Sequence, residues 1–159
     1  MTQDIDSTTA PGARVWITHG IFIVAVIGIG GLLGATFTPG EWYGALTQPS
    51  FTPPPWVFAP VWTTLYVLIG WVGARKFLWG GAMGLWGAQM VANFCWTPVF
   101  FGLHRPFAAL IVIAVMWVLI AAFILREWRS DRLSAVLFLP YLVWVTIATA
   151  VNTGVVWLN

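Results

Sequence analysis

Long runs without a charged side chain follow one another along the chain, and short polar clusters separate them. The uncharged runs lie at residues 15–35, 42–74, 77–103, 106–125 and 133–159. A segment rich in proline and tryptophan occupies the start of the second run. The remaining apolar segments, about 15–36, 56–75, 78–101, 107–127 and 134–157, are each long enough as a helix to cross ~30 Å of hydrocarbon. The pattern therefore predicts an all-α integral membrane bundle of five transmembrane helices.

Composition agrees with this prediction. The chain has 159 residues, of which 60% are hydrophobic and 8% are charged, whereas a soluble domain has about 25% charged residues. We expect a single domain over residues 1–159, with a polar tail at 1–14 and no second unit. The net charge of +2 comes from basic residues beside the predicted spans, so it does not indicate a nucleic-acid partner.

The basic residues are distributed very unevenly between the two sides of the membrane. With five spans, the N-terminal tail and the second and fourth connections share one side. That side carries Arg14, Arg75, Lys76, Arg126, Arg129 and Arg132, whereas the other side carries only Arg105. Because lysine and arginine accumulate in cytoplasmic loops, we expect a cytoplasmic N-terminus.

The connection between the first two spans, residues 37–55, is unusually stiff and aromatic. Pro53, Pro54 and Pro55 follow one another, and Trp42, Tyr43 and Trp56 flank them closely. Proline fixes the backbone torsion φ, so this segment loses little entropy when it is ordered. Rigid backbone and flat aromatic rings are typical of a preformed cover over an apolar ligand.

The third predicted span carries two different ridges. Small residues recur at every fourth position and form a smooth surface that suits contact with another helix, within the chain or in a homodimer; they are Gly80, Gly84, Ala88 and Ala92. Gln89 and Asn93 form a polar ridge, which must face protein or ligand because an amide is costly in lipid. Interhelical hydrogen bonds and recognition of a ligand are both open for these two amides.

Trp62 and Trp144 lie too deep to be interfacial tryptophans. Trp62 is about 9 Å below the outer end of its span, Asn93 is about 12 Å below the outer end of its span, and Trp144 is near the bilayer centre. These depths agree, so one cavity in the outer half could be lined by all three, with Ala148 one turn from Trp144 and Tyr43 above. Ordinary packing remains an equally good explanation for any one of them.

Three runs resemble the TspO/MBR family of tryptophan-rich sensory proteins and mitochondrial translocator proteins, also called peripheral-type benzodiazepine receptors. They are WYGALTQPSFTPPPWVFAPVWTTLY, AQMVANFCWTPVFFG and PYLVWVTIATAVN, in the family's order and spacing. The resemblance implies a five-helix membrane bundle, usually a homodimer. It also implies porphyrin ligands such as protoporphyrin IX and haem, with no obligatory cofactor. For a bacterial member, the inner membrane is the expected location.

The resemblance also assigns roles to individual positions. Tyr43, Trp62, Asn93, Trp144 and Ala148 match residues of the family's ligand pocket, and Pro53, Pro54 and Trp56 match the loop and the entry to the second span. The late tyrosine and basic residue of the animal sterol motif are replaced by Thr153 and Trp157, and a common loop tryptophan is Phe51. These departures argue against sterol recognition by that motif, which is itself a weak pattern.

Three functions follow as hypotheses. A receptor or sensor would bind a porphyrin or a similar lipophilic molecule within the membrane lipid. A facilitative transporter would pass such a molecule across, although mid-span ionisable residues that could couple transport to ions are absent from the sequence. An enzyme is the third alternative. The sequence shows no nucleophile–base pair or metal constellation. The remaining route is the light-dependent porphyrin breakdown that the family resemblance implies for Trp62 and Trp144. His19, His104 and Cys95 are expected to be structural, and no metal site is predicted.

Overall fold

The computed structural model describes residues 11–159, and all of its regular secondary structure over that range is helical, without strands. Its elements are α1 (Pro11–Thr36), α2 (Glu41–Ala45), α3 (Pro55–Trp79), α4 (Met83–Thr97), the π-helical turn η1 (Pro98–Gly102), α5 (Pro106–Ser130) and α6 (Arg132–Leu158). Most of the predicted polar tail lies outside the described residues. Residues 11–14, which were assigned to that tail, instead begin α1, with Pro11 at its start, where a proline needs no hydrogen-bond partner for its nitrogen.

Among the described residues, four helices are long and apolar enough to cross a membrane: Gly12–Thr36, Pro55–Trp79, Pro106–Ser130 and Arg132–Leu158. They contain 25 to 27 residues each, and such lengths exceed the ~20 residues that a bilayer core requires. The chain is therefore an integral membrane protein. The helix α4 is shorter, with 15 residues, and continues into η1.

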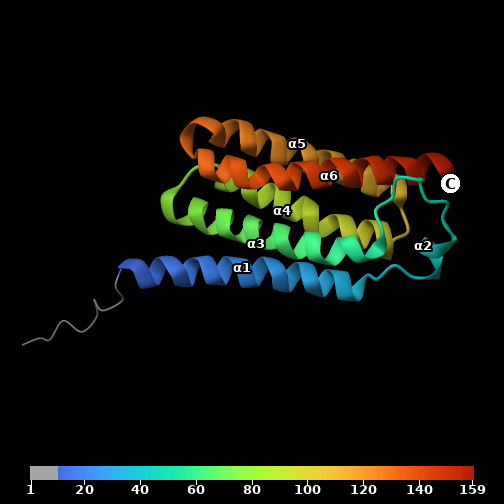
Figure 1. Cartoon of the computed structure of the whole chain (residues 1–159), viewed down its shortest axis with the longest axis horizontal. Coiled ribbons are helices and arrows are strands. Elements are labelled where there is room, and N and C mark those ends of the chain that lie inside the picture. The colour runs from blue at the N-terminus through green and yellow to red at the C-terminus, as the bar shows by residue number, and fades with distance from the viewer. Residues whose placement is uncertain (1–10) are drawn as a thin grey trace, which may run out of the picture.

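The long helices lie alongside one another and run the length of the molecule (Figure 1). In this arrangement α1 packs on α3, α3 contacts α6, and α5 lies between α6 and α4. The segment that contains α2 lies at the same end as the C-terminus (Figure 1). We call this the loop end, and we call the opposite end, where α3 turns into α4 and α5 into α6, the charged end.

The turn between α3 and α4 corrects one prediction. The third span was expected to begin near residue 78, but α3 continues to Trp79 and α4 begins at Met83. Gly80 and Gly81 have φ values of 80° and 114°, which glycine adopts without steric cost and other residues avoid. Gly80 therefore lies in a turn and is not part of a ridge on α4. Gly84 and Ala88 are exposed on α4, and Ala92 is half-buried.

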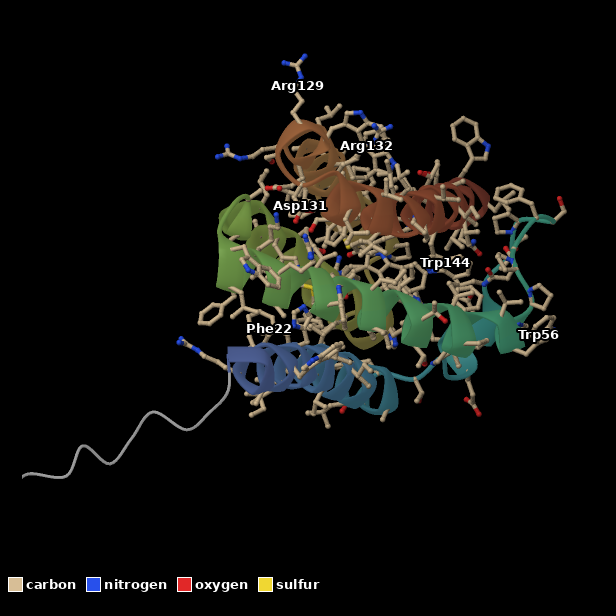
Figure 2. All side chains as sticks on the ribbon, turned by 60° about the vertical axis from the view of Figure 1, so that its left-hand side comes forward. Phe22, Trp56, Arg129, Asp131, Arg132 and Trp144 are labelled. Carbon is tan, nitrogen blue, oxygen red and sulfur yellow. The ribbon has the colours of Figure 1, made fainter. Side chains whose placement is uncertain are left out.

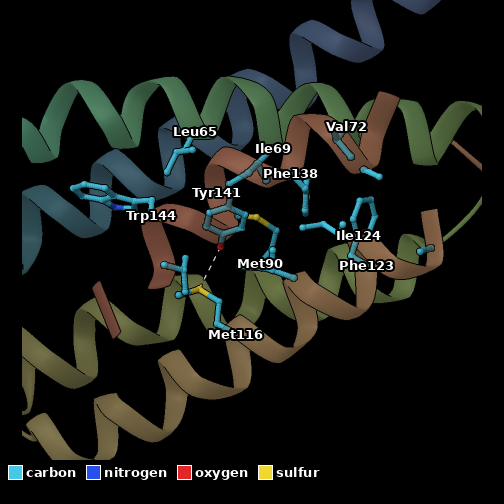
Figure 3. Close-up of a cluster of buried hydrophobic side chains, with 14 of the residues drawn as sticks. Leu65, Ile69, Val72, Met90, Met116, Phe123, Ile124, Phe138, Tyr141 and Trp144 are labelled. Atoms are coloured by element: carbon cyan, nitrogen blue, oxygen red, sulfur yellow. Dashed lines mark hydrogen bonds between the residues drawn. The ribbon is translucent and has the colours of Figure 1, made fainter. Parts of the chain in front are cut away.

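The core consists of interlocking apolar side chains from all the long helices (Figure 3). Phe123 of α5 stacks on Phe138 of α6 with ring centroids 4.3 Å apart, and Tyr141 meets Phe138 edge to face at 5.8 Å. Ile69 and Val72 of α3 are fully buried beside them. This layer fills the middle of the bundle.

A cluster of four charged side chains ties the helices together at the charged end. The Lys76 ammonium lies 2.8 Å from the Glu127 carboxylate and 2.9 Å from that of Asp131. The guanidinium Nη2 of Arg75 lies 3.1 Å from Oδ1 of Asp131. The carboxylate of Glu127 also accepts a 2.7 Å hydrogen bond from the backbone N–H of Ala82. Figure 2 shows Arg129, Asp131 and Arg132 gathered at this end.

The loop end is covered by a segment that is held at several points. Thr47 exchanges two backbone hydrogen bonds with the side chain of Asn159, at 2.9 and 3.2 Å. Pro49 is buried directly against Gly154 of α6. Sequence reasoning missed the five-residue helix α2 inside this segment, because so short a helix has no stability of its own. It forms where Trp42 stacks on His104, with centroids 4.3 Å apart.

Candidate ligand-binding cavity

A cavity of about 740 Å³ lies inside the bundle at the loop end. Its walls come from α1, α3, α4, η1, α5 and α6, and the loop segment covers it. Ligand pockets for small organic molecules usually measure roughly 300–1,000 Å³ and are mainly apolar. The size and the lining of this cavity are typical of such a pocket.

Most of the residues predicted as ligand contacts meet at this cavity. They come from five different places in the chain, and the helix packing brings them together. The residues concerned are Tyr43, Pro53, Pro54, Trp62, Asn93, Trp144 and Ala148.

Two predicted contacts do not line the cavity. Trp56 lies in the first turn of α3, is 76% exposed and points away from the bundle (Figure 2), as an interfacial tryptophan does. Gln89 is fully buried deeper in the core. Its amide donates to the backbone carbonyl of Trp86 at 2.9 Å and accepts from the Tyr141 hydroxyl at 2.9 Å.

A chain of hydrogen bonds forms the floor of the cavity. The Tyr66 hydroxyl donates to Asn93 Oδ1 at 3.3 Å, and Asn93 Nδ2 donates to the Tyr141 hydroxyl oxygen at 2.8 Å. The Tyr141 hydroxyl in turn donates to Gln89 Oε1, and it also contacts the sulfur of Met116 at 3.3 Å (Figure 3). Both polar atoms of the Asn93 side chain therefore have protein partners. Tyr66 and Tyr141 were not predicted, although Tyr66 is one helical turn from Trp62 and on the same face.

Two polar groups at the cavity have no partner. The indole Nε1 of Trp144 and the hydroxyl of Thr52 are buried without a hydrogen bond in the described structure, and both residues line the cavity. A buried polar group left unsatisfied costs about 1–3 kcal/mol. A ligand with hydrogen-bonding atoms at its edge could satisfy both groups. Nothing in the local sequence around Thr52 had indicated this role.

Aromatic rings form the walls. The ring centroids of Trp62 and Tyr66 are 5.2 Å apart. Phe58 packs edge to face against Trp144, with ring centroids 5.4 Å apart. On the α4 side, Trp96 stacks on Phe100 at 5.0 Å.

Phe100 lies in η1, a type of turn that is often found at functional sites. This π-helical turn begins at Pro98 and rotates Phe100 and Phe101 into the cavity wall. Apart from Pro98, no residue in this segment had indicated a π-helical turn.

Tyr43 closes the cavity beneath the loop. Its ring packs edge to face against Phe101 at 5.3 Å and Phe100 at 6.0 Å, and its hydroxyl donates to Gln48 Oε1 at 3.3 Å. Burial raises the pKa of Tyr43 above its ordinary value. Within residues 11–159, no group of three or more His, Cys, Asp or Glu side chains is placed to hold a metal ion.

Comparisons with known proteins agree with this architecture. The model of the TspO/MBR family matches residues 22–158. The chain is 41% identical over 138 residues to Protein CrtK of Rhodobacter capsulatus, covering 81% of this chain and 85% of the relative. It is 40% identical over 139 residues to the tryptophan-rich sensory protein of Cereibacter sphaeroides, covering 86% and 88%. It is 34% identical over 137 residues to the human translocator protein, covering 78% and 80%.

The family match covers the cavity residues from α1 through α6 as well as the loop above them. On this evidence the chain belongs to the TspO/MBR family.

Proposed function

We propose that the protein is a membrane receptor or sensor that binds a porphyrin, such as protoporphyrin IX or haem, in the cavity at the loop end. A tetrapyrrole is a flat apolar disc with two carboxylates on one edge. Aromatic faces stack on such a disc with roughly 0.5–1.5 kcal/mol per pair beyond burial. The names of the relatives, which include a sensory protein and a translocator protein, are compatible with this proposal.

The observation that carries the proposal is the combination of aromatic walls with two unpartnered polar groups. Trp62, Phe58 and Trp144 offer ring surfaces, and Trp144 Nε1 and the Thr52 hydroxyl offer hydrogen bonds that no described protein group takes. A purely apolar guest would leave these two groups unsatisfied. A planar guest with polar atoms at its edge uses both features.

The floor of the cavity favours a receptor over a transporter. Beneath the Tyr66–Asn93–Tyr141 hydrogen bonds lies the fully buried layer of Phe123 and Phe138. The charged cluster of Lys76 and Glu127 follows at the charged end. A ligand in the cavity would have to break all three layers to reach the other side of the membrane.

We further propose the finer membrane topology. The helix α4 with η1, from Met83 to Gly102, is the third of five spans, because α4 and η1 pack beside α5 in the bundle. The N-terminus is cytoplasmic, since Arg126, Arg129 and Arg132 gather at the charged end. For a bacterial protein we propose the inner membrane, with the cavity toward the outer face.

We also propose that two copies associate through the exposed small residues of α4, Gly84 and Ala88, because small residues let helices approach closely in lipid. Gly84→Leu with Ala88→Leu should then halve the detergent-corrected mass of the solubilised protein. An unchanged dimer mass would exclude this surface.

Binding of protoporphyrin IX to the protein in lipid nanodiscs tests the proposed receptor function. The ligand's Soret absorbance should shift on binding. Trp62→Phe with Trp144→Phe should weaken the affinity by roughly tenfold or more, because it removes stacking area and the free indole N–H, and each 1.4 kcal/mol is tenfold.

Trp157→Phe is the matched control. Trp157 is 87% exposed at the end of α6 and does not line the cavity, so this variant should bind as the wild type does. Wild-type affinity in the Trp62/Trp144 double variant would show that the assigned cavity is wrong.

A further inference from the structure

Exposed residues of α1 and α3 border one side of the cavity. Gly31 and Gly34 of α1 and Ala59 and Thr63 of α3 line the cavity, and all four are exposed. A Cβ added at Gly31 or Gly34 would meet nothing within 4 Å. We call this stretch of the interface between α1 and α3 the seam. The residues that border it have small side chains or none.

Deeper in the bundle the same two helices are in direct contact. Gly30 lies against the ring of Tyr66, so closely that a Cβ would overlap it. Further along, a Cβ at Gly70 would lie 2.6 Å from the Cα of Ile23. The opening between α1 and α3 is thus confined to the depth of the cavity, and Tyr66 marks its lower edge.

The water-facing side of the cavity is more firmly closed. The loop is bound to the end of α6 by the two hydrogen bonds between Thr47 and Asn159 and by the buried contact of Pro49 with Gly154. Tyr43 packs on Phe100 and Phe101 beneath it. A ligand that entered from water would have to displace this packing, whereas the seam requires no such rearrangement.

We propose that the ligand enters the cavity sideways, from the hydrocarbon at the loop end of the bundle, through the seam between Gly31–Gly34 of α1 and Ala59–Thr63 of α3. This inference rests on the proposed function and adds the source of the ligand. The species that binds is the planar apolar molecule already dissolved in the membrane. A flat ring can pass edge-on between two helices where side chains are small.

Binding kinetics of protoporphyrin IX preloaded into the nanodisc membrane test this route. Gly34→Phe should slow association and dissociation together, each by about tenfold, because an obstructed route raises one barrier that is common to both directions. Thr63→Phe, which obstructs the seam from α3, should act in the same way. Loss of a binding contact would instead accelerate dissociation.

Two controls complete the design. Gly28→Phe places the same ring on α1 at an exposed position outside the cavity lining, and it should leave both rates unchanged. Asn159→Ala removes both hydrogen bonds that hold Thr47, and it should also leave the association and dissociation rates unchanged.

Faster association in Asn159→Ala, or wild-type rates in both Gly34→Phe and Thr63→Phe, would overturn the lateral route while leaving the receptor proposal intact. A wild type that binds no porphyrin would overturn both.

Discussion

At the scale of single residues, the carboxylate of Glu127 shows how a charge is accommodated at the end of a membrane helix. It is 1% exposed and accepts hydrogen bonds from Lys76 at 2.8 Å, from the Ala82 backbone at 2.7 Å and from Ser130 at 3.0 Å. Lys76 is 3% exposed. Such a pair is costly to bury, so removal of one partner leaves the other buried charge less well compensated.

Glu127→Gln should therefore destabilise the protein by about 3 kcal/mol, the lower end of the range for a broken buried pair. We expect the lower end because Lys76 retains its 2.9 Å contact with Asp131. Chemical unfolding in detergent measures the effect. Glu41→Gln, at an exposed site in α2, is the control, and equal stability of the two variants would contradict this account.

The pKa of the Asp131 carboxyl predicts how the stability of the folded protein depends on pH. Burial by itself raises the pKa of this carboxyl, but hydrogen bonds from Ser134, Arg75 and Lys76 outweigh it and hold the pKa well below its ordinary value. Because the folded-state pKa is depressed, the stabilisation is present above the unfolded value of about 3.9 and is lost as the pH falls below it.

Unfolding measured between pH 7 and pH 3 should therefore show stability decreasing steeply below about pH 4. Asp131→Asn should be less stable at pH 7 and should have a flatter dependence at low pH. A variant that keeps the wild-type slope would assign the acid sensitivity to another group.

At the scale of elements, the contact between α1 and α3 depends on glycine. Gly70 has no room for a side chain, because a Cβ would lie 2.6 Å from Cα and 2.9 Å from the backbone nitrogen of Ile23. Backbone atoms cannot move away as a flexible side chain can, so any larger residue must separate the two helices.

Gly70→Ala should cost about 1–3 kcal/mol, the usual penalty for overpacking. Gly28→Ala, where a Cβ meets nothing within 4 Å, should be neutral or should stabilise the helix by up to about 1 kcal/mol. Thermal unfolding of the two variants measures the difference. A greater loss of stability in Gly28→Ala than in Gly70→Ala would mean that contacts other than the one at Gly70 hold α1 against α3.

At the scale of the whole molecule, the arrangement of layers predicts a ligand site that is closed toward the charged end. The fully buried rings of Phe123, Phe138 and Tyr141 lie between the cavity and the charged cluster. Hydrophobic packing of this density leaves no space for a tetrapyrrole to pass.

Liposomes that contain the protein should therefore transfer protoporphyrin IX from one side to the other no faster than protein-free liposomes. The ligand's fluorescence, quenched by an acceptor enclosed in the vesicle, reports arrival inside. A faster, protein-dependent transfer that Trp144→Phe reduces would support a transporter instead.

Much of the architecture could be predicted from the sequence. The uncharged runs predicted the long apolar helices, because only a helix of this length satisfies its own backbone in hydrocarbon. Charge clusters marked the turns, and the prolines and tryptophans of residues 42–62 marked the loop end, where the cavity lies. These signals are local, so each can be read from neighbouring residues.

The rotation of each helix about its axis was decided by the tertiary structure. Lipid is as apolar as the core, so a membrane helix carries no strong pattern that tells its inner face from its outer face. Gln89 and Asn93 share one face of α4, yet only Asn93 reaches the cavity. Packing also brought Tyr141 to Asn93 and left the Thr52 hydroxyl and Trp144 Nε1 without a hydrogen-bond partner among residues 11–159. The sequence thus determined which segments form the long apolar helices, and only the packed bundle determined which side chains line the cavity.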